Sequence, residues 1–154
     1  MFRDGKCRLQ VTEWRESGDP ISEDFPLYFT TGRVVSQYLS GTQTRRIGGL
    51  VDMYPEPRVE IHPRLAESHG IEESDWVTIT SRRADLTLRA IIVKTIRPDT
   101  VFVPYHWADE QSANKLTHRT LDPRSKIPEF KVSACRIRKA EHVPEWVTTN
   151  GGLR

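Results

Sequence analysis

Short runs in which apolar and polar residues alternate constrain the fold of this chain more than any other feature. In the stretch "DWVTITSRR", valine and isoleucine alternate with Thr78 and Thr80, which we expect on the other face. The stretch "ADLTLRAIIVKTI" that follows alternates in the same way. A period of two is that of a half-buried β-strand, so both stretches are predicted strands. Together with the run "TVFVPY" that follows them, these two strands should supply the core residues Val77, Ile79, Leu86, Leu88, Ile92, Val101 and Val103.

Four more β-prone runs, bounded by Gly, Pro and polar turn residues, complete the pattern. They are "PLYFTT", "RVEIH", "TVFVPY" and "EFKVSACRIRKA". One short helix is predicted in "HPRLAESHG", where Pro63 suits the first helical position and Gly70 suits the left-handed stop. Many short strands with one small helix favour a closed β-barrel over a doubly wound sheet.

The two ends of the chain differ from this central part. "KCRLQVTEW" predicts one further strand, and a turn-rich connector follows it. The tail from Glu141 has no periodic pattern, so we expect a partly ordered extension there. The chain therefore divides into an N-terminal strand and connector over residues 1–24, a mainly β barrel over 25–140 and an extension over 141–154.

Charge and composition argue against several classes of function. Charged residues make up 29% of the 154 residues and the formal net charge is +2, too mild for a dedicated nucleic-acid-binding face. No apolar run approaches the roughly 18 residues that a membrane span needs, and the first residues lack the apolar stretch of a secretory signal. The cysteines, Cys7 and Cys135, are far apart, and the histidines show no metal-binding spacing. We expect a reduced, cytoplasmic protein that contacts neither nucleic acid nor membrane and supplies no metal ligand, with Cys135 as a core thiol.

A long polar and cationic stretch, "TTGRVVSQYLSGTQTRR", follows the first barrel strand. Gly32 would let the backbone approach a ligand closely and leave N–H groups free for oxygen atoms. Arg33, Arg45 and Arg46 offer planar guanidinium groups suited to phosphate. The alternative is an ordinary solvated surface loop.

A second polar stretch precedes the last strand, and it is about as long as an ordered functional loop becomes without secondary structure of its own. It presents Asn114, Thr117, Asp122 and Lys131. Amides such as those of Gln37 and Asn114 can recognise the edge of a heterocycle, because they donate and accept hydrogen bonds together. Two such loops in one small barrel favour a ligand, and their composition favours a phosphorylated heterocycle.

Three blocks of the sequence, in order, resemble the C-terminal cofactor-binding domain of the molybdopterin oxidoreductases, a group that includes assimilatory nitrate reductases and formate dehydrogenases. The block "FPLYFTTGRVVSQYLSGTQTRR" looks like that family's strand and TGR loop. "PEPRVEIHPRLAESHGIEESDWVTITSRR" is similar to its core signature. "VFVPYHWADEQSANKLTHRTLDPRSKIPEFK" looks like its closing loop. Together the blocks run from about Phe25 to Lys131.

The resemblance implies a six-stranded double-psi β-barrel with short helices and a bis-molybdopterin guanine dinucleotide ligand that carries molybdenum or tungsten. Gln37 stands where many relatives carry histidine, and Tyr38 where they often carry tryptophan. His106 would lie near the family's substrate funnel. By position, the cofactor-binding residues would be Thr31, Gly32, Arg33, Val34, Gln37, Tyr38, Ser40, Gly41, Thr42, Asn114 and Lys131.

In that family the metal ligand, and the iron–sulfur cluster where there is one, come from another domain. The resemblance therefore implies that this chain has no catalytic residue of its own and completes a larger catalytic chain or domain. Two other functions are known for barrels of this type. A self-processing decarboxylase needs a Gly-Ser pair, which the sequence lacks. A protein-binding adaptor without cofactor could use Trp146, Arg82 and Arg83 for docking.

Overall fold

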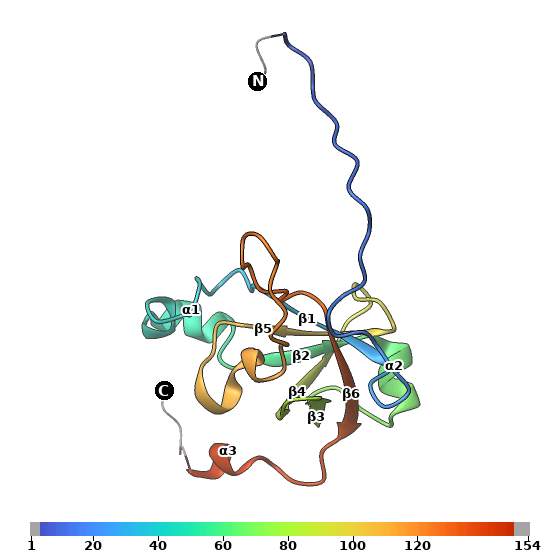
Figure 1. Ribbon diagram of the computed structural model, residues 1–154. Coiled ribbons are helices and arrows are strands. Elements are labelled where there is room, and N and C mark those ends of the chain that lie inside the picture. The colour runs from blue at the N-terminus through green and yellow to red at the C-terminus, as the bar shows by residue number, and fades with distance from the viewer. Residues whose placement is uncertain (1–3, 150–154) are drawn as a thin grey trace.

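The computed structural model describes residues 4–149, and its centre is a closed barrel of six strands (Figure 1). The order around the barrel is β1-β5-β2-β4-β3-β6. The pairs β1/β5 and β2/β4 are parallel, whereas the other four pairs are antiparallel. The six-stranded double-psi barrel predicted from the sequence is confirmed. Its strands are β1 (Leu27–Gly32), β2 (Arg58–Ile61), β3 (Trp76–Ser81), β4 (Asp85–Ile92), β5 (Thr100–Pro104) and β6 (Ser133–Lys139).

The core fills the inside of this barrel. Six of the seven predicted core residues are buried, and Ile92 packs against them while partly exposed. Phe29, Val59 and Ile61 complete the core with no exposed surface. Thr78 was expected on the face opposite the core, but its side chain is also buried. Its hydroxyl lies 2.9 Å from that of Thr87 on β4. Cys135 is a buried core thiol, as expected.

The predicted helix is α2 (Pro63–Ser68), and its signals act as expected. The His62 ring nitrogen accepts the Arg64 N–H at 3.1 Å and caps the helix, while Pro63 occupies its first turn. Gly70 follows with a φ of +60°, in the left-handed region. The remaining helices are short: α1 (Gly48–Met53), α3 (Glu145–Thr149) and the 3-10 turns η1 (Thr44–Arg46), η2 (Asp109–Gln111) and η3 (Ala113–Lys115).

The predicted N-terminal strand is not formed. The segment 6–14 runs away from the barrel as an extended arm (Figure 1), and the structure assigns it no strand partner among residues 4–149. The physical reason is that a strand needs an edge to pair with, and a closed barrel has none. An alternating pattern shows that a segment suits a strand, but it does not show where the partner lies.

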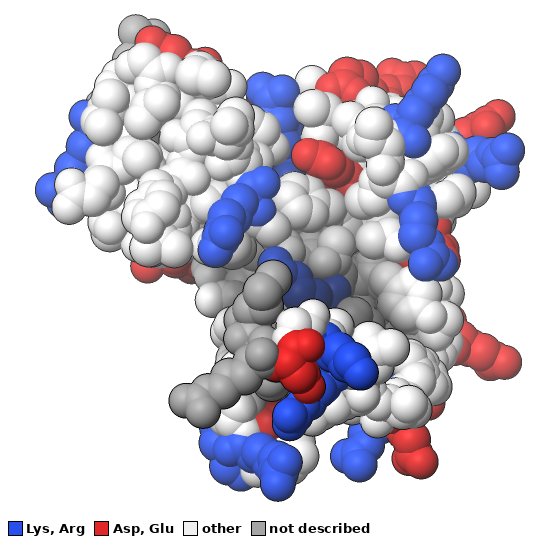
Figure 2. Space-filling model, turned by 90° about the horizontal axis from the view of Figure 1, so that it is seen from above, with Lys and Arg blue, Asp and Glu red and all other residues white. Residues whose placement is uncertain are grey.

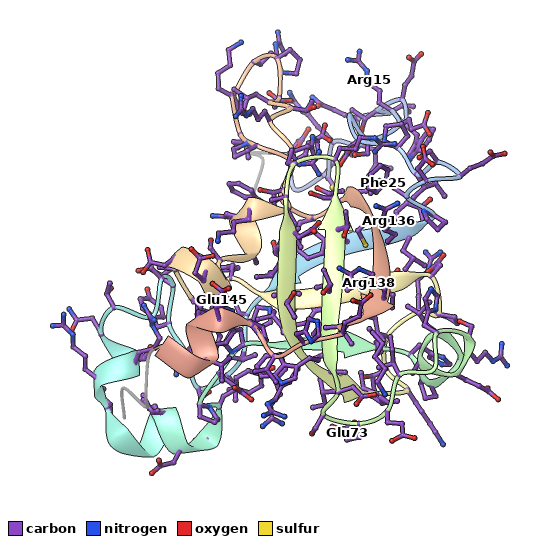
Figure 3. All side chains as sticks on the ribbon, turned by 90° about the horizontal axis from the view of Figure 1, so that it is seen from below. Arg15, Phe25, Glu73, Arg136, Arg138 and Glu145 are labelled. Carbon is purple, nitrogen blue, oxygen red and sulfur yellow. The ribbon has the colours of Figure 1, made fainter. Side chains whose placement is uncertain are left out.

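The connector after the arm is bound to the barrel. Asp19 is buried and accepts hydrogen bonds from Arg82 at 2.6 Å, Arg83 at 2.8 Å and the Ala134 N–H at 3.1 Å. Phe25 lies beside Arg136 on the underside (Figure 3), and the guanidinium carbon of Arg136 is 5.6 Å from its ring centroid. The expected connector is therefore part of the folded unit.

The described part of the C-terminal tail also packs on the barrel. Trp146, on α3, meets Trp76 of β3 edge-on, with 5.9 Å between ring centroids. This contact covers part of the outer wall of the barrel. Residues 150–154 of the predicted extension lie outside the described part of the chain.

Candidate cofactor site

The parallel pairing of β1 with β5 brings the ends of both strands to the same side of the barrel. Gly32 is paired with Pro104, and the N–H of Tyr105 donates to the Gly32 carbonyl at 3.2 Å. Arg33 and Tyr105, the next residue of each strand, therefore leave the barrel side by side. Arg33 Nε donates a hydrogen bond to the Tyr105 hydroxyl at 2.6 Å, and this bond raises the pKa of the guanidinium further. The cation is thus held in one orientation.

The segment before β6 returns to the same place. Thr31 Oγ1 donates to the Phe130 carbonyl at 3.0 Å, and Lys131 Nζ donates to the Thr31 carbonyl at 2.5 Å. The Lys131 ammonium also lies 5.9 Å from the ring centroid of Tyr105. We call residues 128–132 the closing segment. The closing segment therefore brings the positive charge of Lys131 to the same end of β1 as that of Arg33.

Asn114 arrives from η3, on the second polar loop. Ala113 and Leu116, on either side of it, are buried, and Arg83 Nη2 donates to the Leu116 carbonyl at 2.6 Å. The asparagine itself is exposed, and its carbonyl accepts the Thr117 hydroxyl at 3.1 Å. Because its neighbours are fixed to the barrel, the amide of Asn114 is presented from a fixed backbone.

These residues enclose one pocket of about 380 Å³. Figure 2 looks onto this end of the molecule, from which the arm rises, and shows Lys and Arg side chains in a recess of the surface. The pocket combines two cations, an amide and two aromatic rings. Phosphate oxygens can bind to the two cations, and a heterocycle can bind to the amide and the aromatic rings. It is lined by Thr31, Arg33, Tyr105, Asn114, Phe130 and Lys131.

His106 fixes the loop that leaves β1, which we call the loop 33–46. Its Nε2 accepts the Val34 N–H at 3.0 Å, so its Nδ1 carries the proton and donates to the Leu39 carbonyl. Leu39 is held in the left-handed region with a φ of 48°. The His106 side chain is fully buried. Its role in this chain is therefore structural, and its expected place near a substrate funnel stays a prediction.

Gln37 stands out on the loop 33–46 because its amide is buried and only one end of it is hydrogen-bonded. Its Oε1 accepts the Thr44 hydroxyl at 2.6 Å, and the same Thr44 oxygen accepts the Tyr38 N–H at 3.1 Å. These two bonds fix which end of the amide is the oxygen. Its Nε2 has no hydrogen-bond partner within residues 4–149. An unpartnered buried donor costs about 1–3 kcal/mol, so the site favours an acceptor from outside.

Comparison with known proteins agrees with this chemistry. The family model described as "Molydopterin dinucleotide binding domain" matches residues 27–134, which include all six pocket residues. This chain belongs to that family. The assignment expected from the three sequence blocks, with its class of cofactor, is thereby confirmed.

Two relatives of this molybdopterin-binding chain show its usual setting. It is 50% identical over 114 residues to the assimilatory nitrate reductase catalytic subunit of Bacillus subtilis (strain 168), covering 74% of this chain and 16% of that protein. It is 40% identical over 135 residues to the F420-dependent formate dehydrogenase subunit alpha of Methanocaldococcus jannaschii, covering 88% and 20%. The chain thus spans a fifth or less of the length of these relatives.

Among solved structures, acetylene hydratase from Pelobacter acetylenicus has the same fold. The TM-score is 0.68 at 19% identity, over 77% of this chain and 19% of that one. A likeness at this identity concerns the barrel alone. The barrel of this chain therefore also occurs as a part of a much larger protein.

The sequence-predicted residues fall into two groups. The pocket brings together Thr31, Arg33, Asn114 and Lys131. The others do not line this pocket: Gly32 lies at the end of β1, and the loop 33–46 carries Val34, Gln37, Tyr38, Ser40, Gly41 and Thr42. Arg45 and Arg46, expected to face phosphate, lie exposed on η1 and do not line the pocket either.

The packing of the barrel also favours glycine at position 32. A Cβ at this position would lie 2.4 Å from the Phe102 ring, so that space belongs to the protein's own packing. Gly41 has a φ of +73°, and a Cβ there would lie 2.8 Å from the His106 carbonyl oxygen. Both glycines therefore shape the loop that borders the pocket.

Tyr105 and Phe130 were missed in the sequence, although both line the pocket. Tyr105 ends the run "TVFVPY", whose pattern predicts only a strand. The available signal was its place after a strand parallel to the one that ends in Gly32, because parallel strands bring their following residues together. Phe130 precedes Lys131 in the closing block, and no pattern distinguishes it from a core aromatic.

Proposed function

We propose that this chain binds one dinucleotide of a bis-molybdopterin guanine dinucleotide cofactor in the pocket between the ends of β1 and β5 and the closing segment. The observation that carries the proposal is that Thr31 and Arg33, from the end of β1, meet Asn114 and Lys131, from distant parts of the sequence, around one pocket. Membership of the family supplies the class of ligand.

The donors of the pocket fit such a ligand. Arg33 keeps its terminal nitrogens available while Nε is bonded to Tyr105, so a planar pair of donors can face the pyrophosphate. Lys131 adds a second positive charge beside it. The Asn114 amide can donate to and accept from the edge of a heterocycle. Among residues 4–149 no acidic side chain lines this pocket, so the described walls do not repel a dianion.

We assign the loop 33–46 to the same ligand as a flanking wall. Its hydroxyls at Ser40 and Thr42 lie 3.2 Å apart and are exposed, as is Tyr38. The unpartnered Gln37 Nε2 gives the loop a donor that an oxygen of the ligand can satisfy after a small opening of the loop. Val34, Gly32 and Gly41 would contribute through the backbone.

The whole reaction would belong to a larger polypeptide. Both relatives are oxidoreductases by name, a nitrate reductase and a formate dehydrogenase, and this chain matches 16% and 20% of them. We propose a molybdenum- or tungsten-dependent oxidoreductase of that kind, whose metal ligand and any iron–sulfur cluster lie outside residues 1–154. The bound cofactor supplies the redox chemistry. The residues described here hold and orient it.

The adaptor alternative has lost its evidence. Arg82 and Arg83 are bound to Asp19, and Trp146 packs on Trp76. The features that suggested a docking surface therefore serve the fold.

The location of the chain is a separate question. Both cysteines are free, which supports the reducing environment of the cytoplasm. Among residues 4–149 no helix is long and apolar enough to cross a membrane.

Native mass spectrometry of the assembly purified anaerobically from its own host tests the proposal. We expect a larger polypeptide, a pterin dinucleotide and one molybdenum or tungsten atom to accompany this sequence. Arg33→Ala should lower the fraction of assemblies that retain the cofactor. The matched control Arg46→Ala should not, because Arg46 lies outside the pocket. Purification of the chain without pterin or larger polypeptide would contradict the proposal.

A further inference from the structure

The N-terminal arm, which we define as residues 6–14, exposes its large apolar side chains almost completely. Leu9 is 91% exposed, Val11 98% and Trp14 84%. Isolated exposed apolar residues are common, but three within six positions on a segment that projects from the body are not. The arm has the pattern of a strand, and Figure 1 shows it extended away from the barrel. A surface of this kind calls for a partner.

The barrel of this chain cannot be that partner. Each of its six strands is already paired on both sides, so it has no edge to offer. The Lys6 N–H donates to Asp4 at 3.1 Å. Beyond such local contacts, an extended segment can pair its backbone N–H and C=O groups with the edge of another sheet. Once the arm is paired as a strand, its two sides would differ. Leu9 and Val11 would project to one side together with Glu13, and Gln10 and Thr12 would project to the other together with Trp14.

The base of the arm is fixed in position. Ser17 Oγ lies 3.2 Å from Glu129 Oε2 and from the Val132 carbonyl, and the Gly18 N–H donates to Glu129 Oε2 at 3.1 Å. A Cβ at Gly18 would lie 2.2 Å from Thr120, so the chain passes very close to the second polar loop. Asp19 then anchors the connector to the barrel. A fixed base gives the arm a defined exit direction, which lowers the entropy lost when a partner binds.

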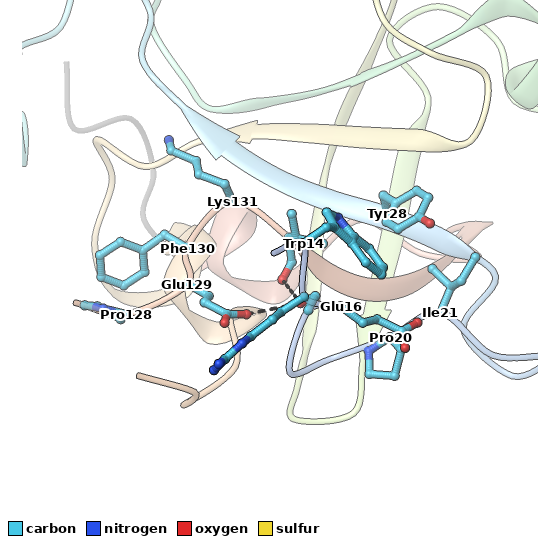
Figure 4. Close-up of a pocket in the computed structure, with 12 residues that line it drawn as sticks. Trp14, Glu16, Pro20, Ile21, Tyr28, Pro128, Glu129, Phe130 and Lys131 are labelled. Carbon is cyan, nitrogen blue, oxygen red and sulfur yellow. Dashed lines mark hydrogen bonds between the residues drawn. The ribbon is translucent and has the colours of Figure 1, made fainter. Parts of the chain in front are cut away.

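A second cavity of about 470 Å³ lies where the arm meets the closing segment (Figure 4). Trp14, Ile21 and Tyr28 line it from the side of the arm and β1, and Phe130 and Lys131 line it from the closing segment. The last two residues also line the cofactor pocket. A partner that lies along the arm therefore reaches a cavity for a side chain, separated from the cofactor pocket by the closing segment alone.

We propose that the arm adds as a β-strand to the edge of a sheet in a larger polypeptide, the one that makes up the remaining length of the relatives. Leu9 and Val11 would then lie against the apolar face of that sheet. A side chain of the same partner would fill the cavity at Trp14. This inference rests on the proposed function, because it needs a larger polypeptide. It adds the surface through which that polypeptide is bound and the mode of binding. The same pairing would hold the closing segment in place beside the cofactor.

Hydrogen exchange, resolved to single amides, tests this pairing in the native assembly from the host and in the isolated chain. In a strand added to one edge, successive N–H groups point alternately to the partner and away. Every second amide between residues 7 and 13 should therefore exchange about 100-fold or more slowly in the assembly, following the free energy of locally opening such a pair. Its neighbours should change little. The design applies whether the two parts are one polypeptide or two.

The double change Leu9→Ser with Val11→Ser removes the apolar face of the arm. It should speed exchange at the protected amides at least about 10-fold in the assembly, since two buried apolar side chains contribute that much or more. The matched control is Gln10→Ser with Thr12→Ser, on the other side of the paired strand, which should leave the protection in place. Both variants keep the barrel intact, because the arm packs on no core residue.

The outcomes separate this inference from the proposed function. If the larger polypeptide is present but the arm amides exchange as fast as in the isolated chain, the arm proposal is wrong and the cofactor proposal stands. Uniform protection without alternation would also overturn it. If the isolated chain shows the same protection because it dimerises, the partner is a second copy and the proposal fails. If no larger polypeptide accompanies the chain, both proposals fail.

Discussion

The Nε atom of Arg33 lies 2.6 Å from the hydroxyl oxygen of Tyr105 and donates a hydrogen bond to it. Each residue directly follows the end of one strand of the parallel pair β1/β5. The parallel pairing of β1 with β5 therefore determines, through this bond, how the guanidinium group is oriented. The proposed cofactor pocket therefore depends on how these two strands pair, and the closing segment and Asn114 complete its wall.

Tyr105→Phe should weaken cofactor binding about 3- to 10-fold, the range expected for one lost hydrogen bond that orients a donor. The free energy of unfolding should change little, because Arg33 is exposed. Binding by the isolated chain can be followed with purified molybdopterin guanine dinucleotide. Tyr28→Phe, outside this pocket, is the control. If Tyr105→Phe costs as much in an Arg33→Ala background as in the unmodified chain, the tyrosine does not act through the arginine.

Leu88→Ala should destabilise the fold by about 2–5 kcal/mol, because the side chain is fully buried in the barrel and the barrel walls limit collapse into the cavity. Val35→Ala, at a position that is 97% exposed, should change the free energy of unfolding by less than about 0.5 kcal/mol. Urea denaturation measures both. Equal effects at the two positions would mean that the barrel interior is not the stabilising core.

The buried Asp19 should make part of the stability dependent on pH. Burial acts to raise its pKa, but hydrogen bonds from Arg83 and the Ala134 N–H and the nearby guanidinium groups outweigh this and lower the pKa below its usual value of 3.8. The folded state thus binds the proton less well than the unfolded state. The resulting stability is present above about pH 4 and is lost as the pH falls through the lower folded pKa.

Asp19→Asn should therefore be less stable near neutral pH and should show a shallower loss of stability between pH 4 and more acidic values, by the same linkage. Asp24→Asn, on an exposed turn, is the matched control and should follow the unmodified chain. Denaturation measured at a series of pH values decides the matter. An unchanged acid profile for Asp19→Asn would remove this residue from the account.

The two cysteines should react at very different rates. Burial raises the pKa of the Cys135 thiol to about 12, whereas Cys7 is exposed on the arm. Because the thiolate is the reactive form, iodoacetamide should modify Cys7 alone in the folded chain and Cys135 only after unfolding. In Cys7→Ser, native protein should take up no label. Rapid labelling of that variant would show that β6 opens in the native state.

Much of the barrel could be predicted because the period of two is a local property of the sequence. Val77, Ile79, Leu86 and Leu88 indicate both a strand and its inner face, and Pro63 and Gly70 mark a helix at both ends. The same argument failed for the arm. Leu9 and Val11 alternate equally well, but pairing requires an edge elsewhere in space, which no local pattern contains.

The candidate site could be predicted only in part. The resemblance of the closing block placed Asn114 and Lys131 with the TGR loop, and the pocket brings them together. The roles of Tyr105 and His106 depend on strand order, because each sits where β5 ends beside β1. A sequence does not show which strands pair in parallel. A neighbour in the barrel that is about 70 residues away in the chain therefore stayed hidden.

A cryo-EM map of the native assembly with its cofactor tests the central claim most directly. The account predicts dinucleotide density in the pocket at the ends of β1 and β5, with pyrophosphate oxygens within about 3 Å of the terminal nitrogens of Arg33 and with Asn114 and Lys131 in contact with the ligand. Cofactor density elsewhere on the barrel, with this pocket filled by protein side chains, would contradict it.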